Sequence, residues 1–502
     1  MQTSALRVRV NILGTAVLAG YVVLTLLSYL QAPALWQSHP AAPRAVAYFN
    51  DLATQYPVIA LHRWLGDSTT VIISYFVPLA FTTAAILLLM LLLPRWERQL
   101  DAAIAALLMR WSVAFAVVAL FAFPVFTQDF WLSMAWGRMV AAGTNPYHNL
   151  FTPDQMTGLP LDHFPMAMSY GPAWAILSGA VMTVSGKSVL AATILFKLVL
   201  LAAWLGSLFL IRRMTEKRPA LDQCIAIAVF GWTPAGVLQS IAEGHNDIVM
   251  VWPALLWLAL LLRDRWLAPV ALAASALVKY VTGPLFLVDV IVDWRRHGLS
   301  WRQLILRFVA PVLFAVAVFG AFFRSWEFFD GARVISEWHF LQPRDAIAAL
   351  ELTFNISLFP AAHVIRVGLA VLGAYYLVAL FKQPTPDNIV KAALALMSAI
   401  SFVGIAHLWP WYVVWTLAFA ALLPNWWLAR FVIGLSILAP FTLAFWWIEP
   451  FPYPREWMAL AMYAVGVLWC VFTRAPATAS ERSPRLALPA ARLAIRDKRV
   501  EG

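Results

Sequence analysis

Charged side chains are scarce in this sequence. Only 12% of its 502 residues are Asp, Glu, Lys or Arg, whereas 62% are hydrophobic, including 25 Trp and 32 Phe. These shares exclude an ordinary soluble globular domain. A hydrocarbon core about 30 Å thick needs roughly 20 apolar residues per helical span, and apolar segments of this kind recur from residue 11 to residue 473. The composition predicts an all-α polytopic membrane protein with about 13 helices, some of them short.

Cysteine and several catalytic signatures are also missing or nearly so. The two cysteines, Cys224 and Cys470, lie in apolar segments without a Cys or His partner at metal-ligand spacing. We expect buried thiols, with neither a disulfide framework nor a zinc site. The sequence shows no Ser, His and Asp order typical of a hydrolase, no phosphate-binding P-loop and no dinucleotide fingerprint. No cofactor is therefore expected.

Basic residues give a formal net charge of +11, but they stand in short clusters between apolar segments. This pattern is typical of membrane topology rather than of a nucleic-acid surface, so nucleic acid is not expected as a partner. Lys and Arg enrichment predicts cytoplasmic N- and C-termini in a multi-pass protein of the cytoplasmic membrane. The loops 32–69 and 125–172 carry only Arg44, Arg63 and Arg138 and are assigned to the outer, periplasmic side.

Two segments do not fit full spans. Residues 266–292 connect two basic clusters but are too short for two crossings, so we expect a re-entrant pair that turns near residues 279–283. The "SGKS" at 185–188 interrupts residues 173–211, which predicts one short, partly inserted helix. Non-helical backbone at membrane depth is tolerated only where it is buried in protein or lines a cavity. A polar cavity is therefore predicted.

Polar and aromatic groups collect on the predicted outer side. They come from the start of the 125–172 loop, from the "NPY" and "YGP" motifs within it, from "GHND" at 244–247 and from "HLWPWY" at 407–412. The candidate residues are Asp129, Asn145, Tyr147, Tyr170, His245, Asn246, Asp247, His407, Trp409, Trp411 and Tyr412. Ionisable groups within a membrane segment are costly and usually functional, so their gathering on one face predicts a site.

Each candidate also has a purely structural interpretation. Asp129 is suited to a helix N-cap, the "NPY" and "YGP" motifs to turns, and "LWPWY" to an interfacial aromatic belt. His245 and Asp247 could pair with each other. Lys279 could extend its amine to the cytoplasmic surface. It is the placement of all of them on one side that favours a functional site.

A lone carboxylate in an aromatic pocket suits a general base that takes a proton from an acceptor hydroxyl. Aromatic faces stack on sugar rings, and Asn and Asp hold hydroxyls. Lys279, His407 and Arg138 are the candidate cations for a leaving phosphate. This combination predicts glycosyl transfer from a lipid-linked donor. No DxD-like pair accompanies Asp129, so no obligatory metal is expected.

The motifs occur in an order that resembles a known family. In sequence they are "QDFWLSMAWGRMVAAGTNPY", "YGPAWAILSGAVMTVSG", "GWTPAGVLQSIAEGHNDIVMV", "ALAASALVKYVTGPLFLV" and "HLWPWYVVW". Together they resemble polyprenol-phosphate-mannose-dependent mannosyltransferases of the GT-C superfamily, especially the actinobacterial α-1,6-mannosyltransferases. The resemblance implies an inverting enzyme with a GT-C-type helical bundle and an outward-facing active site. Its partners would be a polyprenyl-phosphate hexose donor, a glycan or glycolipid acceptor and the lipid bilayer, with Asp129 as base.

The resemblance suggests a division of the chain. Residues 1–100 would form two N-terminal helices and an outer loop, and 101–300 a catalytic module with the outer loop 125–172. Residues 301–474 would form a variable module with an outer loop at 324–360, and 475–502 a disordered basic cytoplasmic tail. Two alternatives stay open. One is a GT-C enzyme that uses another lipid-linked sugar or glycan. The other is a secondary transporter, although no repeat of the kind common in transporters is visible.

Overall fold

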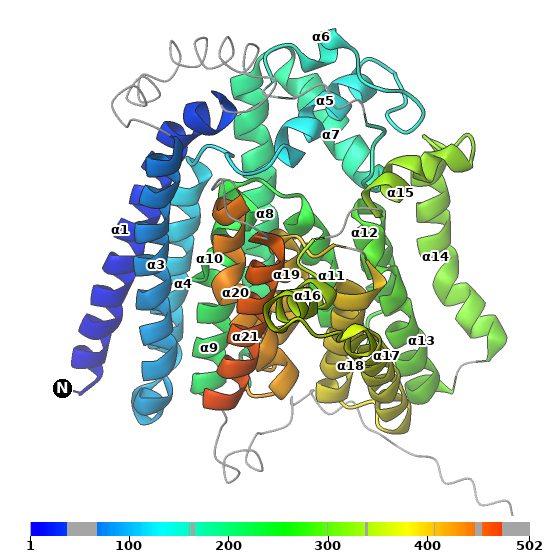
Figure 1. The fold of residues 1–502 in the computed structure, drawn as a ribbon. Coiled ribbons are helices and arrows are strands. Elements are labelled where there is room, and N and C mark those ends of the chain that lie inside the picture. Colours follow the sequence, from blue (N-terminus) through cyan, green and yellow to red (C-terminus); the bar gives the residue numbers. More distant parts are fainter. Residues whose placement is uncertain are drawn as a thin grey trace, which may run out of the picture.

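The computed structural model describes residues 2–37, 68–159, 161, 166–298, 300–336, 340–405, 407–446 and 454–473. All regular elements in these ranges are helices, and the only β pairing among them is an isolated bridge between Phe340 and His407. The prediction of an all-α polytopic membrane protein is confirmed (Figure 1). The predicted tail 475–502 and most of the loop 32–69 lie outside the described residues.

Eight helices in the described part are long and apolar enough to cross a membrane, or nine if one bent pair counts as a single span. Five shorter apolar helices accompany them, so the expected number of 13 depends on how the short and bent helices are counted. The eight are α1 (Gln2–Gln37), α3 (Ser68–Leu92), α4 (Ala102–Leu120), α8 (Val189–Thr215), α14 (Trp301–Gly320), α17 (Phe359–Lys382), α18 (Pro386–Ala399) with its continuation η6 (Ile400–Gly404), and α21 (Pro454–Phe472).

Local sequence explains where several helices begin and end. Asp101 caps α4 by accepting a hydrogen bond from the Ile104 N–H, and Ser300 starts α14 in a capping box with Gln303. Such caps satisfy backbone N–H groups that the first helical turn leaves free. At its other end, α13 (Phe286–His297) stops at Gly298, which adopts the left-handed conformation.

Figure 1 shows how the helices are arranged, and they differ in how much of each is buried. Helices α1, α3 and α4 pack together along one flank, and α5 (Asp129–Ala141), α6 (Pro153–Met156) and α7 (Pro172–Ser185) cover the end opposite the N-terminus. Only 6% of the most apolar stretch of α14 and 11% of that of α17 are buried inside the protein. These two helices therefore present most of their apolar side chains outwards, as helices facing lipid do.

Several helices end or bend in the interior of the bundle instead of continuing as long spans. Helix α12 (Ala268–Val278) ends before Lys279, whose backbone is extended, and η4 (Tyr280–Leu285) leads into α13. The predicted turn near residues 279–283 is confirmed. Helices α9 (Ala220–Gly231) and α10 (Pro234–Val237) with η3 (Leu238–Ala242) form the bent pair, at 57°. Both η3 and η6 are π-helical turns, which are frequent at functional sites.

The remaining helices complete this interior. Helix α11 (Asp247–Leu262) follows η3, while η7 (Pro410–Tyr412) and α19 (Val413–Ala420) follow η6. Helix α20 (Trp427–Trp446) packs against α21. The region 324–360, expected to be an outer loop, contains η5 (Trp326–Phe329), α15 (Asp330–Ser336) and α16 (Pro343–Phe354). Cys224 is buried as expected, but Cys470 is only partly so.

Gly171 joins the start of α7 to the end of α12. Its N–H donates to the Val278 carbonyl at 2.9 Å, and a Cβ placed on it would lie 2.0 Å from the Leu277 carbonyl oxygen. Because backbone cannot yield cheaply, we expect Gly171→Ala to destabilise the protein by about 1–3 kcal/mol. Thermal unfolding in detergent would measure this. Gly368→Ala is the matched control, since its Cβ would meet nothing within 4 Å; equal melting temperatures for both variants would contradict the contact.

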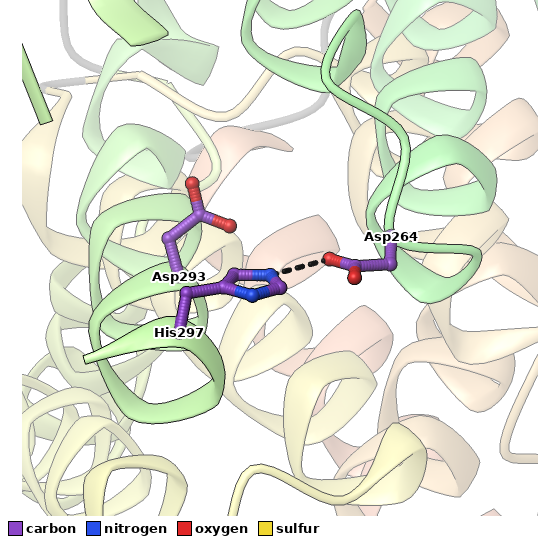
Figure 2. A group of neighbouring side chains, drawn as sticks. All are labelled: Asp264, Asp293 and His297. Carbon is purple, nitrogen blue, oxygen red and sulfur yellow. Dashed lines mark hydrogen bonds and ion pairs between the residues drawn. The ribbon is translucent and has the colours of Figure 1, made fainter. Parts of the chain in front are cut away.

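A group of side chains ties α13 to its neighbours (Figure 2). His297 lies 2.8 Å from Asp264 of the turn after α11. Asp293 forms an ion pair with Arg307 of α14, and Asp289 lies 3.4 Å from the same guanidinium. These contacts hold the C-terminal end of α13, which is the end farther from Lys279, against the turn after α11 and against α14.

Candidate active site

Asp129 is the first residue of α5, after the segment 121–128 that follows α4. Its backbone N–H donates to Thr127 Oγ1 at 3.0 Å. Its Oδ2 lies 3.5 Å from Nδ1 of His245, and its side chain is 28% exposed. The carboxylate thus stands on a short helix within the predicted loop 125–172. It lies beside an imidazole and is partly exposed to solvent.

The environment keeps this carboxylate ionised. Burial acts to raise the pKa of Asp129, but hydrogen bonding to His245, the charges of His245 and Lys279 and a hydrogen bond with Tyr170 outweigh it. The net effect is a pKa below the ordinary value of 3.8. At neutral pH, Asp129 is therefore an anion that can accept a proton or a hydrogen bond.

The "GHND" motif bends the chain so that His245 faces Asp129. Gly244 has φ of +78°, and a Cβ there would lie 2.3 Å from the Phe130 ring, so glycine is needed on both counts. The buried His245 ring stacks on Trp411 with centroids 3.8 Å apart, and Trp411 stacks on Trp409 at 5.0 Å. The imidazole is thereby the end of a column of three parallel rings that fixes its plane.

Asp247 and Lys279 form a second charged pair next to the first. Lys279 Nζ donates to Asp247 Oδ1 at 2.7 Å, and Trp415 Nε1 donates to the same oxygen. The ammonium also lies 4.3 Å from the Tyr412 ring centroid and 5.2 Å from that of Tyr170. Lys279 is only 8% exposed. The interpretations in which Asp247 pairs with His245, or Lys279 reaches the cytoplasmic surface, are therefore wrong.

A cavity of about 600 Å³ opens beside these pairs. Five cationic or titratable basic side chains line it, against one acidic side chain, Asp345. The polar and aromatic residues that line it are Ser169, Tyr170, Lys279, Tyr280, Gln342, Arg344, Asp345, Arg366, His407, Tyr412, Trp415 and Arg455. Asp129 is not itself a wall residue, but Tyr170, which interacts with its carboxylate, is. The cavity and the carboxylate are therefore neighbours.

Some predicted site residues lie elsewhere. Asn145 Nδ2 donates to the Phe322 carbonyl, and Tyr147 OH donates to the Tyr170 carbonyl at 2.8 Å, with its ring stacked on another aromatic ring. Tyr147 thus holds the chain that carries Tyr170, and Asn145 holds the segment just after α14. Arg138 Nη1 donates to the carbonyls of Gln155 and Thr157. None of the three lines the cavity.

Of the remaining candidates, His407 lies on the cavity wall, its Nε2 3.3 Å from the Tyr412 hydroxyl. Asn246 precedes α11 with its Nδ2 buried and without a hydrogen bond. Trp409 and Trp411 belong to the ring column. The structure thus brings "GHND", Lys279 and "HLWPWY" together with Asp129 and Tyr170.

Three arginines of the C-terminal half also reach this site, although only Arg344 was expected near it, as part of the outer loop 324–360. Arg344 on α16, Arg366 on α17 and Arg455 on α21 all reach the cavity. Arg366 carried a signal, because a charged residue within an otherwise apolar helix is by default a functional candidate. The other two stand in segments whose position relative to "GHND" only the fold reveals.

The fold and the site together define a polytopic all-α membrane protein in which a carboxylate and an imidazole stand beside a basic, aromatic-walled cavity. The chain itself belongs to the family described as α-(1→6)-mannopyranosyltransferase, N-terminal domain, which matches residues 14–296. The family resemblance of the sequence motifs is thereby confirmed.

Two relatives carry the name α-(1→6)-mannopyranosyltransferase A. The protein of Corynebacterium glutamicum is 26% identical over 211 residues, which cover 39% of this chain and 41% of the relative. That of Mycobacterium tuberculosis is 22% identical over 340 residues, 62% of this chain and 64% of the relative. The chain therefore spans less than two thirds of the length of either relative. No solved structure matches it.

Proposed function

We propose that this protein is an integral-membrane inverting glycosyltransferase. It moves mannose from a polyprenyl-phosphate donor to a hydroxyl group of a glycan or glycolipid on the outer face of the cytoplasmic membrane. The observation that carries this proposal is the position of the Asp129 carboxylate, 3.5 Å from the His245 imidazole and next to a basic cavity. The family and the names of the relatives support mannose as the sugar.

The charge of the cavity suits a phosphate. Lys279 is already paired with Asp247, and Arg455 lies near Asp345 and Glu456. By contrast, Arg344 and Arg366 are exposed, and among the described residues neither has an ion-pair partner. Their two positive charges are available to an anion, and guanidinium groups match phosphate oxygens in charge and geometry.

An apolar hollow of about 440 Å³ lies on the other face of α16. Arg344, Asp345 and Ala348 of this helix line the basic cavity, whereas Ala346, Ile347 and Leu350 line the apolar hollow. Helices α17, α20 and α21 supply most of its remaining walls. An anionic head next to an apolar tail is the chemistry of a lipid phosphate, and each buried CH₂ contributes about 0.8 kcal/mol. This favours a lipid-linked donor over a soluble one.

The proposed reaction is a single displacement. Asp129 accepts the proton of the acceptor hydroxyl, whose oxygen attacks the anomeric carbon as the bond from that carbon to the phosphate oxygen breaks. The bonding electrons leave with the phosphate, where Arg344, Arg366, Lys279 and His407 would stabilise the added negative charge. Attack opposite to the leaving group inverts the anomeric centre. The domain division at residues 101–300 stays a proposal that rests on this site.

Purified protein in detergent should transfer or release sugar from a short-chain polyprenyl-phosphate mannose. The same donor carrying glucose, galactose or arabinose should react more slowly, and chromatography of labelled sugar would measure each rate. Preferred turnover of another sugar would support the alternative GT-C enzyme. Tight binding of a free solute with no turnover of any donor would overturn the proposal in favour of a transporter.

A further inference from the structure

Lys197 and Glu243 are buried ionisable residues for which the proposed reaction has no direct use. Lys197 stands within α8 and is 2% exposed, and Glu243 follows η3 and is 3% exposed. Neither lines the basic cavity. Burying a charge is costly unless it is paired and hydrogen-bonded, so the contacts of these two side chains are informative.

Glu243 bonds to the segment that leads into α5. Its Oε2 accepts hydrogen bonds from the backbone N–H groups of Val125 at 3.1 Å and Phe126 at 2.9 Å. Phe126 is only three residues before Asp129. A single carboxylate oxygen thus holds the approach to the proposed base.

Lys197 bonds to both segments at once. Its Nζ donates to the carbonyl of Ala122, in the segment before Asp129, at 2.5 Å, and to the carbonyl of Ala242, at the end of η3, at 2.7 Å. The next residues after Ala242 are Glu243, Gly244 and His245. Lys197 therefore joins the chain that carries the base to the chain that carries its imidazole partner.

These contacts form a closed bracket. Lys197 links segment 122–126 to the end of η3 through two carbonyls, and Glu243 links them again through two N–H groups. The close approach of Phe130 to Gly244 adds a steric contact between the same two segments. Asp129 and His245 each follow one of these two segments within a few residues, and Asp129 Oδ2 lies 3.5 Å from His245 Nδ1.

We propose that Lys197 and Glu243 are positioning residues that set the distance between Asp129 and His245. The inference rests on the proposed function for the consequence of that distance, but the bracket itself is testable without turnover. A misplacement of about 1 Å can cost about 100-fold in rate. The bracket would therefore act on turnover rather than on donor binding.

Two conservative substitutions separate positioning from mere charge balance. Glu243→Gln keeps the length of the side chain and an oxygen that can accept from the two N–H groups, but it removes the negative charge near Lys197. Glu243→Asp keeps the charge but draws the carboxylate back by one methylene. Positioning predicts that the aspartate variant is impaired and the glutamine variant is not. Charge balance predicts the reverse.

Steady-state kinetics of the three proteins in detergent provide the first test. We expect Glu243→Asp to lower kcat about 10- to 100-fold with donor KM changed by less than about threefold, and Glu243→Gln to keep kcat within about threefold of wild type. Glu216→Asp, the same change in an exposed ion pair of α8's end, is the matched control. Full kcat in Glu243→Asp, or an equal loss in Glu243→Gln, would overturn the proposal.

Hydrogen exchange provides the second test and needs no activity. Mass spectrometry of the peptide around residues 122–128 should show faster amide exchange in Glu243→Asp than in wild type, and wild-type exchange in Glu243→Gln. Equal exchange in all three proteins would contradict the proposed positioning role. Absence of sugar transfer by the wild type would instead count against the proposed function. The hydrogen-exchange result would still show whether Glu243 positions the segment before Asp129.

Discussion

An Asp129→Asn variant is expected to lose turnover by about 100- to 10 000-fold, the usual contribution of a general base. The amide has the shape of the carboxylate but cannot accept the proton of the acceptor hydroxyl. Donor binding should persist, because Asp129 is not a wall residue of the basic cavity. Measuring kcat together with the donor dissociation constant would separate the two effects.

Asp154→Asn is the matched control for this variant, since Asp154 is an exposed acid of α6. The pH profile adds a second check. Because the pKa of Asp129 is held below 3.8, the carboxylate stays ionised well into the acidic range, and protonation of this residue should not lower the rate between about pH 8 and pH 5. Undiminished turnover in Asp129→Asn would remove the proposed base.

A combined Arg344→Gln and Arg366→Gln variant is expected to lower donor kcat/KM by more than either single substitution. A hydrogen bond to a charged group contributes roughly 1.5–3 kcal/mol, and solvent screening of these exposed side chains reduces that value. We therefore expect about a tenfold loss for each arginine. The loss should fall on the donor and leave acceptor KM unchanged, which initial rates at varied donor and acceptor would show.

Lys187→Gln offers the matched control, because Lys187 is an exposed cation that does not line the cavity. Added salt should weaken donor binding in the wild type more than in the double variant, since mobile ions screen exposed charges. Wild-type kcat/KM in the double variant would move the phosphate away from α16 and α17, towards Lys279 and His407.

The part of the site that the sequence predicted is the part built from contiguous motifs. Asp129, "GHND", Lys279 and "HLWPWY" each carry polar groups in or beside apolar segments, where their cost makes them conspicuous. The break at Lys279 was predictable because residues 266–292 are too short for two spans. Together these features located most of the residues around the carboxylate.

The sequence was less informative where a local pattern has two structural outcomes. Asn145 and Tyr147 stand in a turn motif, and their side chains hold the backbone of Phe322 and Tyr170 instead of entering the cavity. Pairing depends on the fold as well: Asp247 is close to His245 in sequence, yet it bonds to Lys279, which follows α12. Such choices depend on tertiary packing, which a single sequence does not display.

The helix count illustrates the same limit. Length and hydropathy predict long spans well, but α11, α12 and α19 are short because their ends meet inside the bundle. A π turn that ends a helix, such as η3, leaves little trace in hydropathy. That the arginines of α16, α17 and α21 share one cavity was not predicted for a related reason, since only the fold brings them together.

Helix α16 separates the basic cavity from the apolar hollow by the thickness of one helix, about 10 Å. A donor that occupies both must fold over this helix near its head, so the enzyme would measure only the part of the lipid next to the phosphate. Isoprene units beyond the hollow would remain in the bilayer and contribute nothing to selection. Membranes that differ in polyprenol length could then supply the same enzyme.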